Sequence, residues 1–188
     1  MLSIDERLEL LKRRLLSEEF LKLRRNAGLN FFIFDYDPSD ELAVRAFVSS
    51  LDISLGGSRM LRKFDLFGIM AKILREKNYM DKVLLKESQS GSESIINPIR
   101  RTLRLTLDSC LITNEIARAA APDDIILITG VGKAWPVIRS HAILNSLYDR
   151  MPENPLILFF PGNYEDDLKL FNEVSDGNYY RAFKLIER

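Results

Sequence analysis

The chain has 188 residues, 46% of them hydrophobic and 29% charged, and this balance is typical of a globular protein that buries a core. Its 27 Lys and Arg residues equal its 27 Asp and Glu residues, so the formal net charge of zero argues against a dedicated nucleic-acid-binding protein. The single cysteine, Cys110, excludes an intrachain disulfide and favours a reducing compartment.

The N-terminal segment is predicted to be a helical element over about residues 3–27. Ser3 and Glu6 have the spacing of a capping box, and a stripe of leucines follows. A second short helix is expected over 17–28. Charges interrupt the segment, which is unlike a signal peptide, and no stretch of the chain approaches the roughly 20 apolar residues of a membrane span. We therefore expect a cytoplasmic protein without membrane contact.

Strands and helices are predicted to alternate after this element. The aromatic run FFIFDYD at 31–37 is typical of a central strand. Asp37 and Pro38 then have the residue types of an N-cap and a first helical residue, which predicts a helix that ends near Leu51. A second strand is expected over 58–66, after the Gly-Gly break that precedes it.

The middle of the chain is predicted to be mainly helical. An amphipathic helix is expected over about 65–77. The stretch 87–94, ESQSGSES, has no apolar residue and is expected to be a flexible loop. Residues 95–121 fit both strand alternation and helical spacing, and the helix-forming sequence NEIARAAA favours helix. Pro122 ends this segment.

The C-terminal part returns to strands. A buried strand begins at Ile125, and a second strand, over 156–160, ends abruptly at a Pro-Gly pair. A helix is expected around 166–174, and a last strand over 179–186. Strands separated by helices predict a single α/β domain over 1–188, with a mostly parallel, Rossmann-like central sheet flanked by helices and the N-terminal helices added to it.

The turn Thr129–Lys133, TGVGK, is compared with phosphate-binding loops. A Walker loop would need glycine where Leu127 stands and Ser or Thr in place of Ala134. The dinucleotide pattern fails too, since its third glycine would be Trp135. We therefore expect a tight strand-to-helix turn with no bound nucleotide or other cofactor.

Asp35 and Asp37 flank Tyr36 at the end of the first strand, and alternation puts both carboxylates on one face. A divalent metal is one interpretation, but Asp37 is already explained as a helix cap and no further acidic cluster completes a metal shell. A nucleotide- or metal-dependent enzyme that uses a crevice at Asp35, Asp37, Thr129 and Gly130 is kept as the alternative function.

His141 is the only histidine and shares a helical stripe with apolar residues, so a packing role is favoured over catalysis. No serine or cysteine nucleophile stands in a recognisable elbow. Arginines gather at 100–104 and around 59–63. The favoured interpretation of both clusters is a solvated surface, and direct DNA binding is not expected.

Four phrases resemble the BrxB family, a small component of BREX bacteriophage-defence systems, in order along the chain: 31–38, 126–147, 156–164 and 176–186. The most specific parts are TGVG followed by P-x-x-R-S-H, then FFPG, then NYYRAF. The resemblance implies a role in a defence assembly that also contains a large ATPase, a DNA methyltransferase and PglZ, an alkaline-phosphatase-like protein. The family has no assigned catalytic residues to carry across.

The favoured function is therefore a non-enzymatic adaptor that binds other defence proteins, with the PglZ-like component as the first partner and the ATPase or methyltransferase as further ones. Interface hot spots are rich in Trp, Tyr and Arg, although many such residues fill cores instead. The candidate partner-binding residues are Trp135, Arg139, His141, Tyr164, Tyr180 and Arg181.

Overall fold

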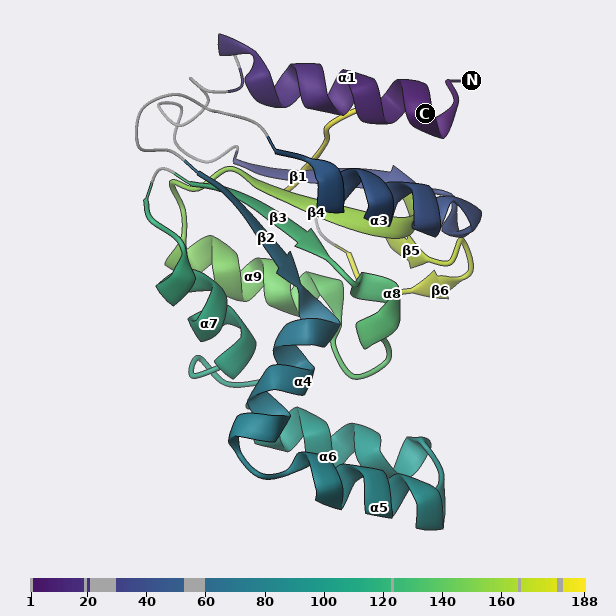
Figure 1. Cartoon of the computed structure of the whole chain (residues 1–188), viewed down its shortest axis with the longest axis vertical. Coiled ribbons are helices and arrows are strands. Elements are labelled where there is room, and N and C mark those ends of the chain that lie inside the picture. Colours follow the sequence, from purple (N-terminus) through teal and green to yellow (C-terminus); the bar gives the residue numbers. More distant parts are fainter. Residues whose placement is uncertain are drawn as a thin grey trace.

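The computed structural model describes residues 2–18, 20, 30–52, 60–122, 124–165, 167–178 and 181–188. Within them the strands form one sheet, whose main path has the order β2-β3-β4-β1-β7 with every neighbouring pair parallel (Figure 1). These strands are β1 (Phe31–Tyr36), β2 (Leu61–Asp65), β3 (Ile125–Thr129), β4 (Leu156–Tyr164) and β7 (Phe183–Lys184).

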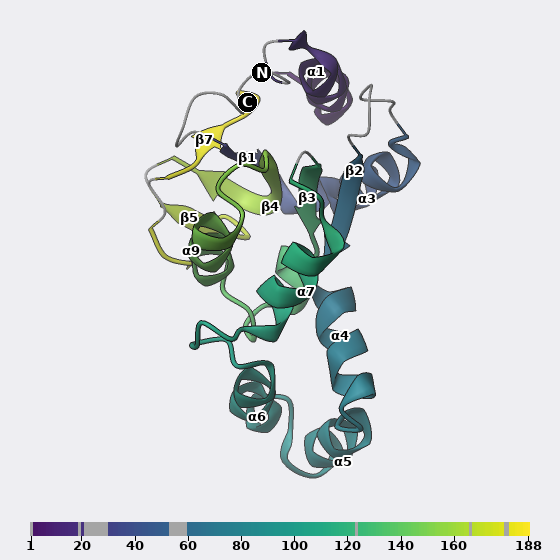
Figure 2. The ribbon, with the colours of Figure 1, turned by 90° about the vertical axis from the view of Figure 1, so that its left-hand side faces the viewer.

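Both faces of the sheet are apolar, because its central strands are nearly continuous hydrophobic runs. In β1, Phe31 and Ile33 belong to the core on one face, and Phe32 and Phe34 to the core on the other. Helices cover both faces (Figure 2), which confirms the expected α/β, Rossmann-like class. One face carries α4 (Leu66–Glu76), α7 (Leu111–Ala119), the single turn α8 (Val131–Ala134) and α9 (Ser140–Arg150), and the other carries α1 (Ile4–Leu16) and α3 (Glu41–Ser50).

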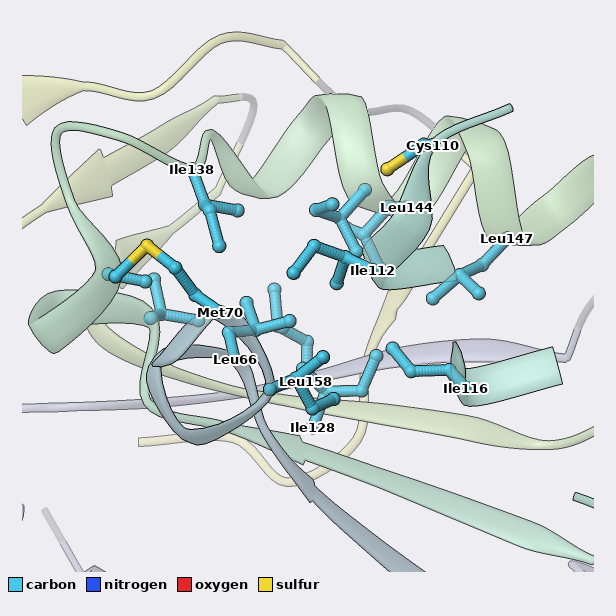
Figure 3. Packing of buried hydrophobic residues seen from close by; sticks show 14 of the residues in the cluster. Leu66, Met70, Cys110, Ile112, Ile116, Ile128, Ile138, Leu144, Leu147 and Leu158 are labelled. Atoms are coloured by element: carbon cyan, nitrogen blue, oxygen red, sulfur yellow. The ribbon is translucent and has the colours of Figure 1, made fainter. Parts of the chain in front are cut away.

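The larger core lies between the sheet and the helices α4, α7 and α9 (Figure 3). Leucine, isoleucine and methionine side chains from the three helices meet those of β3 and β4 there. Cys110 is buried beside them and packs as a small apolar side chain. The labelled members are Leu66, Met70, Cys110, Ile112, Ile116, Ile128, Ile138, Leu144, Leu147 and Leu158.

The prediction of a flexible loop over 87–94 is wrong. The helix α5 (Met80–Ser90) runs through the first half of this stretch, and α6 (Glu93–Leu103) begins in the second half. Gly91 joins them in the left-handed region at φ 76°, a conformation that glycine adopts without steric cost. The polar residues are therefore the end of one helix and the start of the next, in a hairpin that projects from the body below α4 (Figure 1).

Three C-terminal expectations also differ from the structure. The strand β4 does not end at Pro161 but continues to Tyr164, and from Gly162 onward it pairs antiparallel with β5 (Leu168–Leu170). A helix expected around 166–174 is replaced by β5, a turn and β6 (Val174–Ser175), since the buried-exposed-buried pattern of β5 is the alternation of a strand. Of the last strand, expected over 179–186, residues 179 and 180 lie outside the described part of the chain, and within 181–186 only Phe183 and Lys184 form a strand.

The remaining elements agree with expectation apart from their ends. Ser3 and Glu6 form the capping box of α1, while most of the second short helix expected over 17–28 lies outside the described residues. A 3-10 turn, η2 (Pro38–Asp40), precedes α3. The helical segment expected over 95–121 is confirmed but divided into α6 and α7.

Candidate functional site

Asp35, the first half of the suspected metal pair, is fully buried and surrounded by cations. Its carboxylate lies 3.1 Å from Nη2 of Arg7, 3.4 Å from Nζ of Lys184 and 3.5 Å from Nε of Arg188. The backbone N–H of Tyr164 donates to it as well, at 3.1 Å. Both carboxylate oxygens are thus engaged by positive groups, an environment that opposes a metal cation.

Asp37, the second half of the pair, has a different set of contacts. It is the N-cap of η2, and its carboxylate accepts hydrogen bonds from the backbone and the hydroxyl of Ser39. These bonds hold the pKa of Asp37 below its ordinary value. Asp37 therefore caps a helix as expected, and within the described residues no group of three or more His, Cys, Asp and Glu side chains is placed to hold a metal ion.

The TGVG segment forms the expected strand-to-helix turn between β3 and α8. Gly130 has φ 76°, and a Cβ atom at this position would lie 2.6 Å from Oδ1 of Asp65, so a larger residue does not fit. Asp65 caps α4 through the N–H of Gly68 and forms an ion pair with Lys133. The lysine that suggested phosphate binding is thus already paired with a carboxylate.

A small crevice does lie at the carboxyl ends of β2 and β3, with a volume of about 250 Å³. Glu41, Arg45, Asp65, Thr129 and Lys133 are among its lining residues, so its charge is mixed. Glu41 accepts a hydrogen bond of 2.5 Å from the hydroxyl of Tyr36. Burial, and then this bond, raise the pKa of Tyr36, which keeps the phenol protonated as a donor.

Three of the candidate partner-binding residues lie along the segment that runs from the end of α8 into the start of α9. Trp135 is half-buried and follows α8, and the guanidinium of Arg139 lies 6.0 Å from the centroid of its ring. Arg139 also lies 3.7 Å from the buried carboxylate of Asp176. His141 Nδ1 contacts the carbonyl oxygen of Asp176, and because a carbonyl only accepts, Nδ1 is the donor.

The other three candidates are placed differently. Tyr164 is buried, its hydroxyl donates to the carbonyl of Ala182 at 2.9 Å, and burial raises its pKa. A buried side chain offers no surface to a partner, so Tyr164 leaves the set of candidate contacts. Arg181 is exposed, with its guanidinium 4.9 Å from the ring of Tyr148 on α9. Tyr180 lies outside the described residues.

Two of the arginines that suggested nucleic-acid contact, one from each cluster, are bonded within the protein. Arg100 donates to the carbonyl oxygens of Pro136 and Val137 at 2.5 and 3.0 Å. Arg62 donates to Asp124 at 2.8 Å. Both guanidinium groups thus hold neighbouring segments together, which reduces what they offer to phosphate.

An apolar cavity of about 600 Å³ opens between α4, the α5–α6 hairpin and the segment from α8 to Val137. We call it the hairpin groove. Trp135 is one wall, which connects the groove to the cluster described above, and its buried indole N–H has no acceptor among the described residues. Its apolar lining is Phe67, Met70, Ala71, Leu74, Met80, Val83, Leu84, Ile95, Ile96, Ile99, Ala134, Trp135, Pro136 and Val137.

Sequence reasoning found Trp135 but missed the rest of the groove. The signal was present in α6, where Ile95, Ile96 and Ile99 have the spacing of one helical face. The interpretation of 87–94 as a loop separated these residues from Leu84 on α5. Once that stretch is recognised as the junction of two helices, both apolar faces belong to one hairpin.

Fold and site together define a class: a Rossmann-like α/β protein whose polar residues at the strand ends are engaged in internal contacts, and whose apolar groove is built by an inserted helical hairpin. A family model described as BREX protein BrxB matches residues 62–185. The chain belongs to this BrxB family, as the resemblance indicated.

Two relatives support the assignment over almost the whole chain. A BREX protein BrxB of Bacillus cereus (strain H3081.97) is 42% identical over 192 residues, which cover 98% of each chain. A BREX protein BrxB of Escherichia coli O9:H4 (strain HS) is 30% identical over 185 residues, which cover 97% of this chain and 92% of the relative. No solved structure matches the chain significantly. None of the helices that the structure describes is long and apolar enough to cross a membrane.

Proposed function

We propose that the chain is a non-enzymatic adaptor of a BREX-type phage-defence complex and binds other defence proteins in the cytoplasm. Membership of the BrxB family supports the defence role. The hairpin groove is the observation that supports the adaptor role, because its lining includes the exposed side chains of Phe67 and Leu84. Exposed apolar patches with polar rims are typical of protein interaction sites.

The PglZ-like protein of the alkaline-phosphatase family is the partner that we favour from the family resemblance, and the BREX ATPase and methyltransferase are the other candidates. Trp135 in the wall of the groove and Arg139 near its ring are residue types that dominate the binding energy of interfaces. Direct DNA contact is not part of the proposal, because the net charge is zero and Arg62 and Arg100 are engaged internally.

The alternative, a nucleotide- or metal-dependent enzyme, rests on the crevice at the carboxyl ends of β2 and β3. In open α/β sheets this end of the strands is where ligands bind. The support is weaker, because Asp35 is surrounded by cations and Lys133 is paired with Asp65. Thermal unfolding with and without nucleotides and divalent metals separates the two functions. A saturable rise in melting temperature favours the enzyme.

Co-expression tests the adaptor directly. The tagged chain is produced together with the other proteins of its defence system, and the proteins retained at moderate salt are identified. We expect the PglZ-like protein to be retained in a fixed ratio to the tagged chain. Retention of none of these proteins by a chain that is folded by circular dichroism would contradict the adaptor function.

A further inference from the structure

We infer that the hairpin groove is the docking site for an amphipathic helix of a partner protein, and that the helix carries Lys or Arg beside its apolar face. This inference rests on the proposed adaptor function and specifies which surface binds the partner. It joins two features of the groove: an apolar floor made by helices, and a rim with two carboxylates that have no ion-pair partner among the described residues.

The floor of the groove suits apolar anchors. Its walls come from α4, α5, α6 and the segment after α8, and Ile95, Ile96 and Met80 line it while only half-buried. Phe67 is 42% exposed and Leu84 is 54% exposed at its edge. A volume of about 600 Å³ is within the range of sites that bind small molecules or the anchors of a peptide.

The secondary structure of the walls favours a helical ligand. The groove is lined by helices and a short connecting segment, and a helix uses its backbone N–H and C=O groups within itself. A peptide bound as an extended strand would find no sheet edge here to pair with. An amphipathic helix satisfies its own backbone groups and inserts side chains spaced at i, i+3 or i+4, and i+7.

The charges of the rim favour basic residues on that helix. Glu87 near the end of α5 and Glu93 at the start of α6 line the groove on its hairpin side. Glu87 accepts a hydrogen bond from Ser92, and neither carboxylate has an ion pair among the described residues. Lys133, the one cation in the lining, is already paired with Asp65. The unpaired charge of the rim is therefore negative, and it complements Lys or Arg.

Adjacent leucines of α5 give a matched pair of variants. Leu84 lines the groove and is 54% exposed, whereas Leu85 is 59% exposed and is not part of the lining. In the co-expression experiment, Leu84→Glu is expected to weaken retention of the partner about tenfold or more, the effect of an interface hot spot. Leu85→Glu places the same charge one residue away and is expected to bind like the wild type.

The charge of the partner is tested separately. Glu87→Lys is compared with Glu9→Lys, which makes the same change on the exposed side of α1. Peptides of about 20 residues that tile the retained protein are measured by fluorescence anisotropy at two salt concentrations. The binding peptide is expected to become helical, to carry basic residues beside its apolar stripe, to lose affinity for Glu87→Lys and to bind more weakly at high salt.

The outcomes separate this inference from the proposed function. If the wild type retains the partner and Leu84→Glu retains it equally, the groove inference is overturned and the adaptor function stands. Equal loss in the Leu84 and Leu85 variants also overturns the groove, because it places the contact on the outer face of the hairpin. A binding peptide that is acidic or extended overturns the helix assignment. No retention by the wild type overturns both proposals.

Discussion

Arg7 of α1 and Asp35 of β1 form an ion pair in which the two side chains are 5% and 0% exposed. Arg7 also donates to the carbonyl oxygens of Ile186 and Glu187, both at 3.1 Å. Burial lowers the pKa of Arg7, and the charge of Asp35 opposes this effect. One guanidinium thus connects the first helix, the central sheet and the C-terminal residues.

Removal of Arg7 is expected to destabilise the protein. Arg7→Ala leaves the buried carboxylate of Asp35 with fewer partners and breaks the bonds to the last residues, so we expect the free energy of unfolding to fall by about 3 kcal/mol. This value is at the lower end of the range for breaking a buried ion pair, because Lys184 and Arg188 remain near Asp35. Urea denaturation measures the change.

Arg13→Ala is the matched control, since Arg13 lies on the same helix and is exposed. It is expected to change the free energy of unfolding by no more than about 0.5 kcal/mol. Equal effects of the two substitutions would contradict the role assigned to the pair with Asp35, because Ala is at least as good a helix former as Arg at both positions.

The sheet and most helices could be predicted because their signals are local. The run at 31–36 and the strand at Ile125 are continuous apolar stretches, and α1 carries its own capping box. The failure at 87–94 is also local in origin. Serine, glycine and glutamate are common in loops and at helix ends alike, so composition alone does not show that one helix ends at Ser90 and the next begins at Glu93.

The role of Asp35 could not be predicted, because its partners are distant in the sequence. Arg7 precedes it by 28 residues, and Tyr164 follows it by 129. An acidic residue at the end of a strand has the same local pattern whether it faces a ligand or three cations. The hairpin groove was missed for a similar reason, since its walls come from segments as far apart as Phe67 and Val137.

His141 is expected to be structural. Its Nδ1 donates to the carbonyl of Asp176, while the carboxylate of Asp176 accepts from the N–H of Ser140 at 2.7 Å, so the start of α9 and the C-terminal segment are joined twice. His141→Ala is expected to lower the free energy of unfolding by about 1–3 kcal/mol. His141→Asn places an amide N–H near the position of Nδ1 and should recover part of the free energy of unfolding that His141→Ala loses.

Thermal and urea unfolding of both His141 variants measure these changes. Retention of the partner in the co-expression experiment is expected to persist at temperatures where the variants remain folded. An unchanged melting temperature together with loss of the partner would instead place His141 in the interface.

The TGVG turn is expected not to bind ATP. Lys133 is paired with Asp65, and the space beside Gly130 is occupied by the same carboxylate. Isothermal titration calorimetry with ATP and magnesium should give no micromolar affinity for the wild type or for Lys133→Ala, and the variant should fold. Saturable heat in the wild type that disappears in the variant would contradict this and favour the enzyme.

Asp124 is expected to make stability depend on pH. Its side chain is 1% exposed and accepts hydrogen bonds from Arg62, from the N–H of Met60 and from the N–H of Ala121. Burial raises the pKa of Asp124, but these bonds outweigh burial and hold the pKa below its ordinary value. The unfolded state therefore binds a proton at a higher pH than the folded state does.

The sign of the effect follows from this difference. The contribution of Asp124 is fully present above the unfolded pKa of about 3.9, and it is lost as the pH falls through the lower pKa of the folded state. Asp124→Asn is expected to lower the free energy of unfolding by about 2 kcal/mol at pH 7, and the gap to the wild type should narrow below about pH 4. Urea denaturation between pH 7 and pH 3 measures the stability of the wild type and of Asp124→Asn.

The control is Asp81→Asn, at an exposed position of α5, which should change stability at pH 7 by less than about 0.5 kcal/mol. A gap between Asp124→Asn and wild type that stays constant down to pH 3 would show that the bonds of Asp124 do not depend on its charge.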